Sequence, residues 1–340
     1  MAGARAFHSV HPLTAALGVD DDTAVLAAAI NAVLERPTHS PEAAERARDK
    51  HLQRVACAAV GVAVPGFVLH EFDTMAAPAV RYPCVVKPLR LAASRGVIRA
   101  DDPATLAAAL ARVRAILGAT SDRVLIEDFV PGAEVALEGL LTGGRLFVLA
   151  LFDKPDPLDG PFFEESIYVT PSRLAAATQD AIARVTQQAV DAIGLREGPV
   201  HAELRVNERG PWLIELAARP IGGRCSAALH FGDGVSLEEI ICRQALALPA
   251  PSLEREALAS GVMMIPVPGP GTLREVRGLA AARAVPLVEG VEIAAHPGER
   301  LVPWPEGSRY PGFIFARGKA PAGVEAALRA AHARLEFVLE

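Results

Sequence analysis

PVHAELRVNERGPWLIELAARPIGGR, residues 199–224, is the stretch that decides the fold. Residues 200–206 alternate between apolar and polar side chains, which is the period of a β-strand with one buried face. A second apolar run covers residues 211–217, and Glu208-Arg209-Gly210 between the two runs fits a three-residue hairpin loop. The stretch therefore predicts a β-hairpin.

The loop sets the register of this hairpin. Asn207 would pair with Pro211, and continued pairing places Glu203 opposite Glu215 on one face. Opposed Cβ atoms lie about 5 Å apart, so two carboxylates at these positions repel each other. A shared proton or a bound cation removes the repulsion, and oxygen ligands favour Mg²⁺, which commonly combines one or two carboxylates with substrate phosphates. The alternative is a solvent-facing sheet with scattered charges.

Arg219 extends the same face. It follows Glu215 by four residues, so it points to the carboxylate side if the strand continues, and Pro220 then ends the strand. Two carboxylates, a divalent metal and an arginine on one hairpin suit phosphoryl transfer, because that reaction requires mainly the stabilisation of negative charge.

Composition limits the classes of function. The chain has 340 residues, a formal net charge of −6 and 51% hydrophobic residues, which suits about two domains with ample cores. Its charge and its 5% aromatic content do not indicate a nucleic-acid surface. The four cysteines are far apart, and we find neither a secretory signal nor an apolar run of about 18 residues. We therefore expect a reduced, cytoplasmic protein that binds neither nucleic acid nor membrane.

Helical patterns occur along the chain. Asp21 or Asp22 would cap a helix that reaches about Arg36, with Leu26 in its apolar stripe, and Ser40 would cap a second helix that runs to about Gly61. Lys50 falls inside this second helix, where a surface charge is its simplest interpretation. Further helices are expected over residues 103–117, 171–193, 236–247 and 322–338.

The strand expected at residues 82–89 carries Lys87 on an apolar face. A buried ammonium there needs an anion, whereas Pro88 favours an edge strand with the ammonium in water; both interpretations stay open. The following loop, residues 90–97, has small residues and two arginines and can bring backbone N–H groups to a phosphate. Further strands are expected over residues 124–130, 135–141, 145–153 and, as short segments, within 260–316.

Six motifs together resemble the ATP-grasp superfamily and, within it, the carboxylate–amine ligases of L-amino acid ligase type. They occur in the order that the family uses: DKHL at 49–52, VVKP at 85–88, EDFVPGAE at 127–134, DKPDPLDGPFFEE at 153–165, HAELR at 201–205 and IELAARPIGG at 214–223.

The resemblance implies an α+β fold in which two α+β subdomains clasp ATP. Residues 49–250 would form this core, with a lid subdomain at about 76–127, and residues 251–340 a C-terminal α+β subdomain. Residues 1–48 would be a helical remnant of the domain that precedes the core in the family, because so few residues cannot form its sheet. We expect either a natural truncation or a late annotated start, and an exposed partial domain favours a homodimer.

The resemblance also implies site residues, with ATP and Mg²⁺, or Mn²⁺ in its place, as cofactors. Glu203 and Glu215 match metal ligands, and Arg219 the arginine that steadies the acyl phosphate; Arg219 and Lys87 would be catalytic. The residues that match nucleotide contacts are Lys50 and Lys87 for phosphates, Ser94 and Gly96 in the phosphate loop, Glu127, Asp128, Phe129 and Val130 around adenine, and Glu134 at the ribose.

The implied reaction joins a small carboxylate, expected to be an amino acid, to an amine through an acyl phosphate. The chain departs from the family at Ala217, where an asparagine is usual, and at Ala92-Ala93, where glycines are common. Two alternatives remain: a carboxylase-like subunit that activates bicarbonate, and a nucleotide-binding remnant that has lost turnover.

Overall fold

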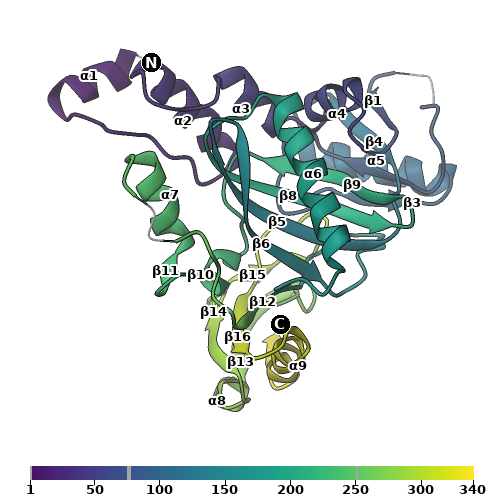
Figure 1. The fold of residues 1–340 in the computed structure, drawn as a ribbon. Coiled ribbons are helices and arrows are strands. Elements are labelled where there is room, and N and C mark those ends of the chain that lie inside the picture. Colours follow the sequence, from purple (N-terminus) through teal and green to yellow (C-terminus); the bar gives the residue numbers. More distant parts are fainter. Residues whose placement is uncertain (1, 75–77, 250–251) are drawn as a thin grey trace.

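The computed structural model describes residues 2–74, 78–249 and 252–340. Four helices open the chain, and Figure 1 shows the first of them at the outer edge of the molecule. Their bounds are α1 Ala2–Val10, α2 Asp21–Val33, α3 Pro41–Arg48 and α4 Lys50–Ala59.

Helix α2 buries a different face from the one expected. Asp20 caps the helix by accepting a hydrogen bond from the Thr23 backbone N–H. The buried side chains are Ala24, Ala27, Ala28 and Asn31, whereas Leu26 is half exposed. Small alanines allow α2 to approach its neighbours closely, so the apolar stripe built from larger side chains was the wrong prediction.

The single helix expected from residue 41 to residue 61 is also wrong, because Asp49 interrupts it. Asp49 has an extended backbone, and its carboxylate accepts hydrogen bonds from the N–H groups of His51 and Leu52 at the start of α4. Lys50 is therefore the first residue of a new helix. It is 4% exposed, so its interpretation as a surface charge is wrong as well.

A four-stranded antiparallel sheet, named the lid sheet after the subdomain expected there, has the order β1-β4-β2-β3. One apolar cluster joins this sheet to α5, Pro103–Leu117. Strand β2 lies inside the sheet, so the edge-strand alternative for Lys87 is wrong. The lid subdomain was expected to begin at about residue 76, which lies outside the described residues. The sheet also contains β1, which comes before that residue. The bounds are β1 Phe67–Glu71, β2 Cys84–Lys87, β3 Ile98–Ala100 and β4 Arg123–Asp128.

An eight-stranded sheet forms the body, in the order β14-β16-β12-β7-β6-β5-β8-β9. Strands β12, β14 and β16 come after the border expected at residues 250 and 251, which lie outside the described residues. The sheet therefore contains strands from both sides of that border. The bounds are β5 Ala133–Thr142, β6 Arg145–Lys154, β7 Ile167–Thr170, β8 Gly198–Asn207, β9 Gly210–Ala217, β12 Ala259–Met264, β14 Val288–Ile293 and β16 Gly312–Gly318.

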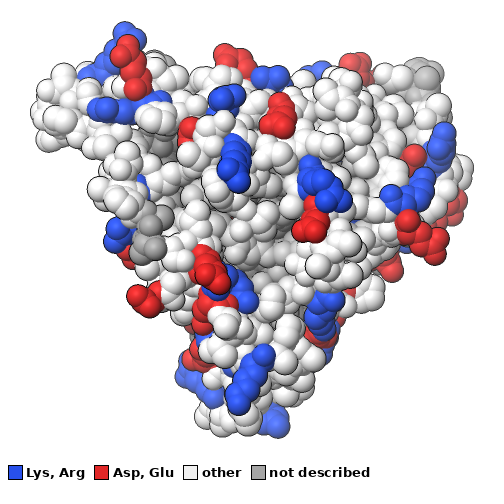
Figure 2. All heavy atoms as spheres, in the orientation of Figure 1, with Lys and Arg blue, Asp and Glu red and all other residues white. Residues whose placement is uncertain are grey.

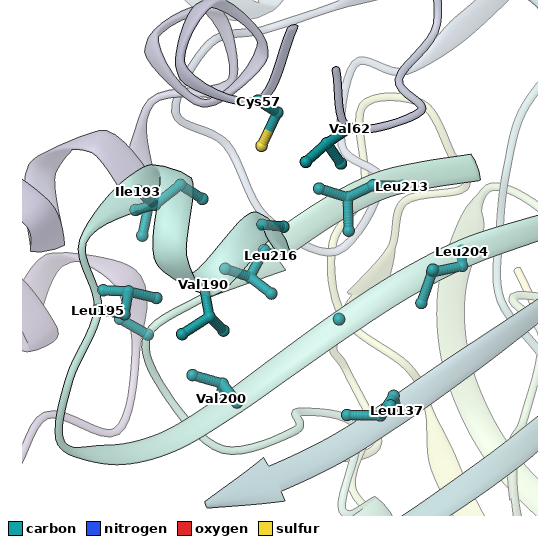
Figure 3. Packing of buried hydrophobic residues seen from close by; sticks show 14 of the residues in the cluster. Cys57, Val62, Leu137, Val190, Ile193, Leu195, Val200, Leu204, Leu213 and Leu216 are labelled. Carbon is teal, nitrogen blue, oxygen red and sulfur yellow. The ribbon is translucent and has the colours of Figure 1, made fainter. Parts of the chain in front are cut away.

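Helices cover both faces of this sheet. On one face α6, which spans Ala176–Ile193 and so starts later than expected, packs Val190 and Ile193 against β8 and β9 (Figure 3). The other face carries α7 Leu237–Ala245, a 3₁₀ turn Cys225–Ala228 and the short strands β10 His230–Phe231 and β11 Val235–Ser236. Helices α8 Leu279–Arg283 and α9 Pro321–His332 cover the C-terminal strands (Figure 1).

The last helix ends earlier than expected. After α9 the chain forms strand β17, Glu336–Leu339, which pairs with β13, Gly271–Arg277. Strand β15, Arg300–Leu301, completes this small sheet. Alternation in the final residues supports a strand, but it also fits the stripe of a longer helix; the partner strand decides the outcome.

The central hairpin has a shorter loop than expected and the expected register at its far end. Asn207 pairs with Gly210, so the loop has two residues, Glu208 and Arg209, and the three-residue prediction is wrong. A β-bulge at Ile214 inserts one residue into β9 and restores the pairing of Glu203 with Glu215. The facing carboxylates are therefore confirmed, although the loop that predicted them is different.

The surface carries both signs of charge. Figure 2 shows lysine and arginine interspersed with aspartate and glutamate on the face in view. No helix among the described residues is long and apolar enough to cross a bilayer.

Candidate active site

A cavity of about 270 Å³ lies between the lid sheet and the body sheet. Its lining includes residues from α2, from the lid, from β8 and β9, and from the C-terminal segment around Tyr310. Of the residues that the motifs indicate, all except Gly96 line this one cavity: Lys50, Lys87, Ser94, Glu127, Asp128, Phe129, Val130, Glu134, Glu203, Glu215 and Arg219.

Buried lysines distinguish this cavity from the rest of the chain. The sequence contains only four lysines, and Lys50, Lys87 and Lys154 are buried at or beside the cavity, whereas Lys319 is exposed. Lys50 Nζ lies 3.1 Å from Glu215 Oε1 and donates a hydrogen bond to the Leu91 carbonyl. Buried ammonium groups are costly unless they face anions, so their concentration here indicates a site for anionic ligands.

Lys87 belongs to a buried network of three charges. Its Nζ lies 2.7 Å from Glu127, and Arg54 Nε lies 2.6 Å from the other oxygen of that carboxylate. Burial alone would raise the pKa of Glu127, but the Arg54 and Lys87 charges hold it below its usual value. The side chain of Glu127 thus connects the lid to α4 and positions Lys87.

Lys154 joins three carboxylates. Its Nζ lies 2.8 Å from Glu134, 2.6 Å from Glu165 and 3.1 Å from Glu203. Oxygens of the three carboxylates lie within 4.8 Å of one another, so they form a candidate cation site. Burial, opposed by Lys154, raises the pKa of Glu165 to about 7. Glu165 can therefore exchange a proton near neutral pH.

The two facing carboxylates of the hairpin are each neutralised by a lysine. Glu203 contacts Lys154, and Glu215 contacts Lys50. His201 also approaches Glu203, with its Nε2 3.4 Å from that carboxylate and its Nδ1 3.4 Å from the fully buried Glu138. Carboxylate oxygens are suitable ligands for Mg²⁺. Glu203 lies close to Glu134 and Glu165 around Lys154, a group that hairpin register alone did not predict and that does not include Glu215.

Arg219 is held from outside the hairpin. Its Nε lies 2.8 Å from Asp21 at the start of α2, and its guanidinium donates a hydrogen bond to the Pro220 carbonyl. Burial would lower the pKa of Arg219, but Asp21 raises it. The segment before α3, which carried no predicted site residue, therefore reaches the cavity.

The loop at residues 90–97 has an unusual backbone. Ala93 and Ser94 have φ values of 54° and 53°, and Gly96 has 73°. A Cβ at Gly96 would also lie 2.8 Å from a Pro88 side-chain carbon, so glycine fits this position for two reasons. Trp304 donates its indole N–H to the Ala93 carbonyl at 2.8 Å, and the C-terminal segment thereby holds the loop.

The residues expected around adenine and ribose are also tied together. Arg205 Nε lies 2.9 Å from Glu134, and its guanidinium donates to the Val130 carbonyl at 2.8 Å. The same guanidinium lies over the Phe129 ring, 5.0 Å from its centre. Glu134 is thus oriented by two cations, Lys154 and Arg205.

Two known families match separate parts of the chain. The ATP-grasp domain matches residues 80–228, and the L-amino acid ligase C-terminal domain 2 matches residues 263–340. The crystal structure of an L-amino acid ligase from Bacillus licheniformis superimposes with a TM-score of 0.82 and 29% identity, covering 99% of this chain and 83% of that one.

Curated relatives agree with this match. Dapdiamide A synthase of Enterobacter agglomerans is 30% identical over 187 residues, which are 52% of this chain and 43% of that protein. Alanine–anticapsin ligase of Bacillus subtilis is 29% identical over 206 residues, 53% of this chain and 43% of that protein. The chain spans about half the length of the curated relatives it matches. The chain thus combines an ATP-grasp domain with an L-amino acid ligase C-terminal domain.

Sequence reasoning missed several residues that build the cavity. Arg54 was missed because an apolar stripe is the usual sign of a buried helix face, whereas the buried face of α4 is mostly polar: Lys50, Gln53, Arg54 and Cys57. Lys154, Glu165 and Arg205 stood within recognised motifs, but nothing in their spacing showed that they converge. Asp21 carried only the signal of a helix cap, and Trp304 and Tyr310 carried no local signal.

Proposed function

We propose that the chain is an ATP- and Mg²⁺-dependent ligase that joins a small carboxylate, most simply an amino acid, to an amine. The observation that carries this proposal is a set of three cations around one cavity, the buried Lys50 and Lys87 and the partly buried Arg219, together with the facing carboxylates Glu203 and Glu215. Such a site can stabilise the negative charge of phosphate groups and bind a divalent ion at the same time.

The reaction would proceed in two steps. A substrate carboxylate oxygen attacks the γ-phosphorus of ATP; the bond between that phosphorus and the bridging oxygen breaks, and ADP leaves. An amine nitrogen then attacks the acyl carbon, phosphate leaves with the electron pair of the broken C–O bond, and the nitrogen loses a proton. The product is an amide.

Each site residue has a distinct task in these steps. Lys50 and Lys87 neutralise the transferred phosphoryl group, and Arg219 holds the acyl phosphate while the amine approaches. Ser94 and Gly96 belong to the loop that covers the phosphates and excludes water, which would otherwise hydrolyse the acyl phosphate. Residues 127–130 and Glu134 hold the adenosine. Mg²⁺, held by Glu203 and Glu215, would supply charge neutralisation on the β- and γ-phosphates.

The relatives support this reaction class. The curated relatives include an alanine–anticapsin ligase and a D-alanine–D-alanine ligase. Incubation of the chain with Mg²⁺, ATP and pooled amino acids, followed by mass spectrometry, tests the proposal. We expect ADP together with a dipeptide or another amide. Nucleotide binding without any amide would instead favour a chain that has lost turnover.

A further inference from the structure

Tyr310 presents a buried hydroxyl to the cavity. Its oxygen is shielded from solvent, and within residues 2–74, 78–249 and 252–340 no group forms a hydrogen bond with it. Leaving a buried hydroxyl without a hydrogen-bond partner is destabilising, so such a group within a binding cavity indicates a polar partner that arrives with a ligand.

The ring of Tyr310 is fixed in direction by its neighbours. It lies 4.8 Å from the Trp304 ring and 6.3 Å from the Phe313 ring, measured between centres. Trp304 is in turn anchored to the Ala93 carbonyl of the phosphate loop, and Phe313 lies within β16. The hydroxyl is therefore presented by a rigid support, as selective recognition of a ligand requires.

The position of Tyr310 favours the substrate end of the cavity over the nucleotide end. Tyr310 packs against the apolar cluster that contains Ile221 and Cys225, just after Arg219, whereas the adenosine residues 127–130 belong to the lid side. Burial, and then Glu165 and Glu164, raise the pKa of Tyr310 well above its usual value. The hydroxyl stays protonated at neutral pH and can both donate and accept a hydrogen bond.

We propose that Tyr310 is a specificity-determining residue whose hydroxyl forms a hydrogen bond with a polar group of the amino acid that the enzyme joins. The inference rests on the proposed function and adds to it a contact from the C-terminal segment. It also predicts that Tyr310 and Trp304 act on different ligands, although their rings are in contact: Tyr310 on the amino acid, and Trp304, through Ala93, on ATP.

The test compares Tyr310→Phe with the wild-type chain in amino-acid-stimulated ADP release, using the most active single amino acid from a pooled screen. We expect the KM for the amino acid to rise about tenfold or more, because a hydrogen bond to a charged or polar substrate group is lost. The KM for ATP and the melting temperature should stay close to the wild-type values. Tyr82→Phe, at a residue that is 37% exposed, removes the same atom elsewhere and should change neither constant.

The outcomes separate this inference from the proposed function. An unchanged KM for the amino acid in Tyr310→Phe would overturn the inference and leave the ligase intact. An equal rise in both KM values would also overturn it, because Tyr310 would then act through the phosphate loop. If the wild-type chain shows no stimulated release with any amino acid, the proposed function fails and the inference fails with it.

Discussion

Replacing Glu127 by glutamine should destabilise the protein far more than its conservative size suggests. Glu127 is 2% exposed and compensates both Arg54, which is fully buried, and Lys87, which is 8% exposed. The amide has almost the same shape but no charge, so two buried cations would remain without a counter-charge. Removing one partner of a buried ion pair typically costs about 3–5 kcal/mol.

The lower end of that range is the better expectation here. Arg54 keeps hydrogen bonds to the Gln53 side chain and to the Ile214 carbonyl. A loss of about 3 kcal/mol corresponds to a decrease in melting temperature of roughly 4 °C in a chain of this size. The decisive assay is urea unfolding followed by circular dichroism, together with a thermal melt. Glu71→Gln, at an exposed position in the same sheet, is the matched control.

A double variant isolates the charge effect. Lys87→Met alone leaves Arg54 to compensate Glu127, and the Glu127→Gln, Lys87→Met double variant should lose less stability than the sum of the two single losses. If Glu127→Gln costs less than about 1 kcal/mol, or if the two losses simply add, the reasoning from the three-charge network is refuted.

Three further predictions follow from the same contacts. The difference in unfolding free energy between the wild type and Glu127→Gln should be largest above pH 4.5, the usual pKa of a glutamate carboxyl. It should shrink as the pH falls through the lower pKa of Glu127 in the folded protein, because protonation then removes the charge in the wild type too. Denaturation at about pH 7 and at about pH 3 measures this difference. Trp304→Phe should raise the KM for ATP by about 2- to 10-fold, with an unchanged KM for the amino acid, because the Ala93 carbonyl loses its donor; steady-state kinetics with each substrate varied in turn provide the check. Lys154→Met should lower the free energy of unfolding by about 3 kcal/mol, since three carboxylates then face one another, and added Mg²⁺ or Mn²⁺ should restore part of this loss. The control Lys319→Met should leave stability unchanged. Thermal melts with and without the ion measure both variants, and a melting temperature of Lys154→Met that does not rise with the ion would contradict the prediction.

Local patterns predicted much of the fold. The strands of the hairpin, the lid helix α5 and strands β4, β5 and β6 lie close to their expected ranges, because each has a clear apolar period and Pro or Gly at its ends. The prediction failed where two local signals compete. Asp49 interrupts a helix because its side chain caps the next one, and nothing in the composition of residues 41–61 distinguishes a cap from an exposed acid.

The candidate site shows the same limit more clearly. The pairing of Glu203 with Glu215 could be predicted because strand pairing is a local rule, although a two-residue loop and a bulge at Ile214 together produce it. The contacts of Glu127 with Arg54 and of Arg219 with Asp21 join segments far apart in the chain. Such contacts depend on how the sheets and helices pack, which the period of a single segment does not determine.

The measurement that tests the central claim most directly is ADP release from Mg²⁺-ATP with pooled amino acids, compared between the wild-type chain and Glu215→Ala. Glu215 lies opposite Glu203 and contacts Lys50, so it is essential to the proposed metal and phosphate site. We predict release that depends on amino acids in the wild type and disappears in the variant. Because the buried Lys50 then loses its carboxylate partner, both proteins are assayed well below the melting temperature of the variant. Release that persists undiminished in Glu215→Ala would contradict the placement of the metal and phosphate site on this hairpin.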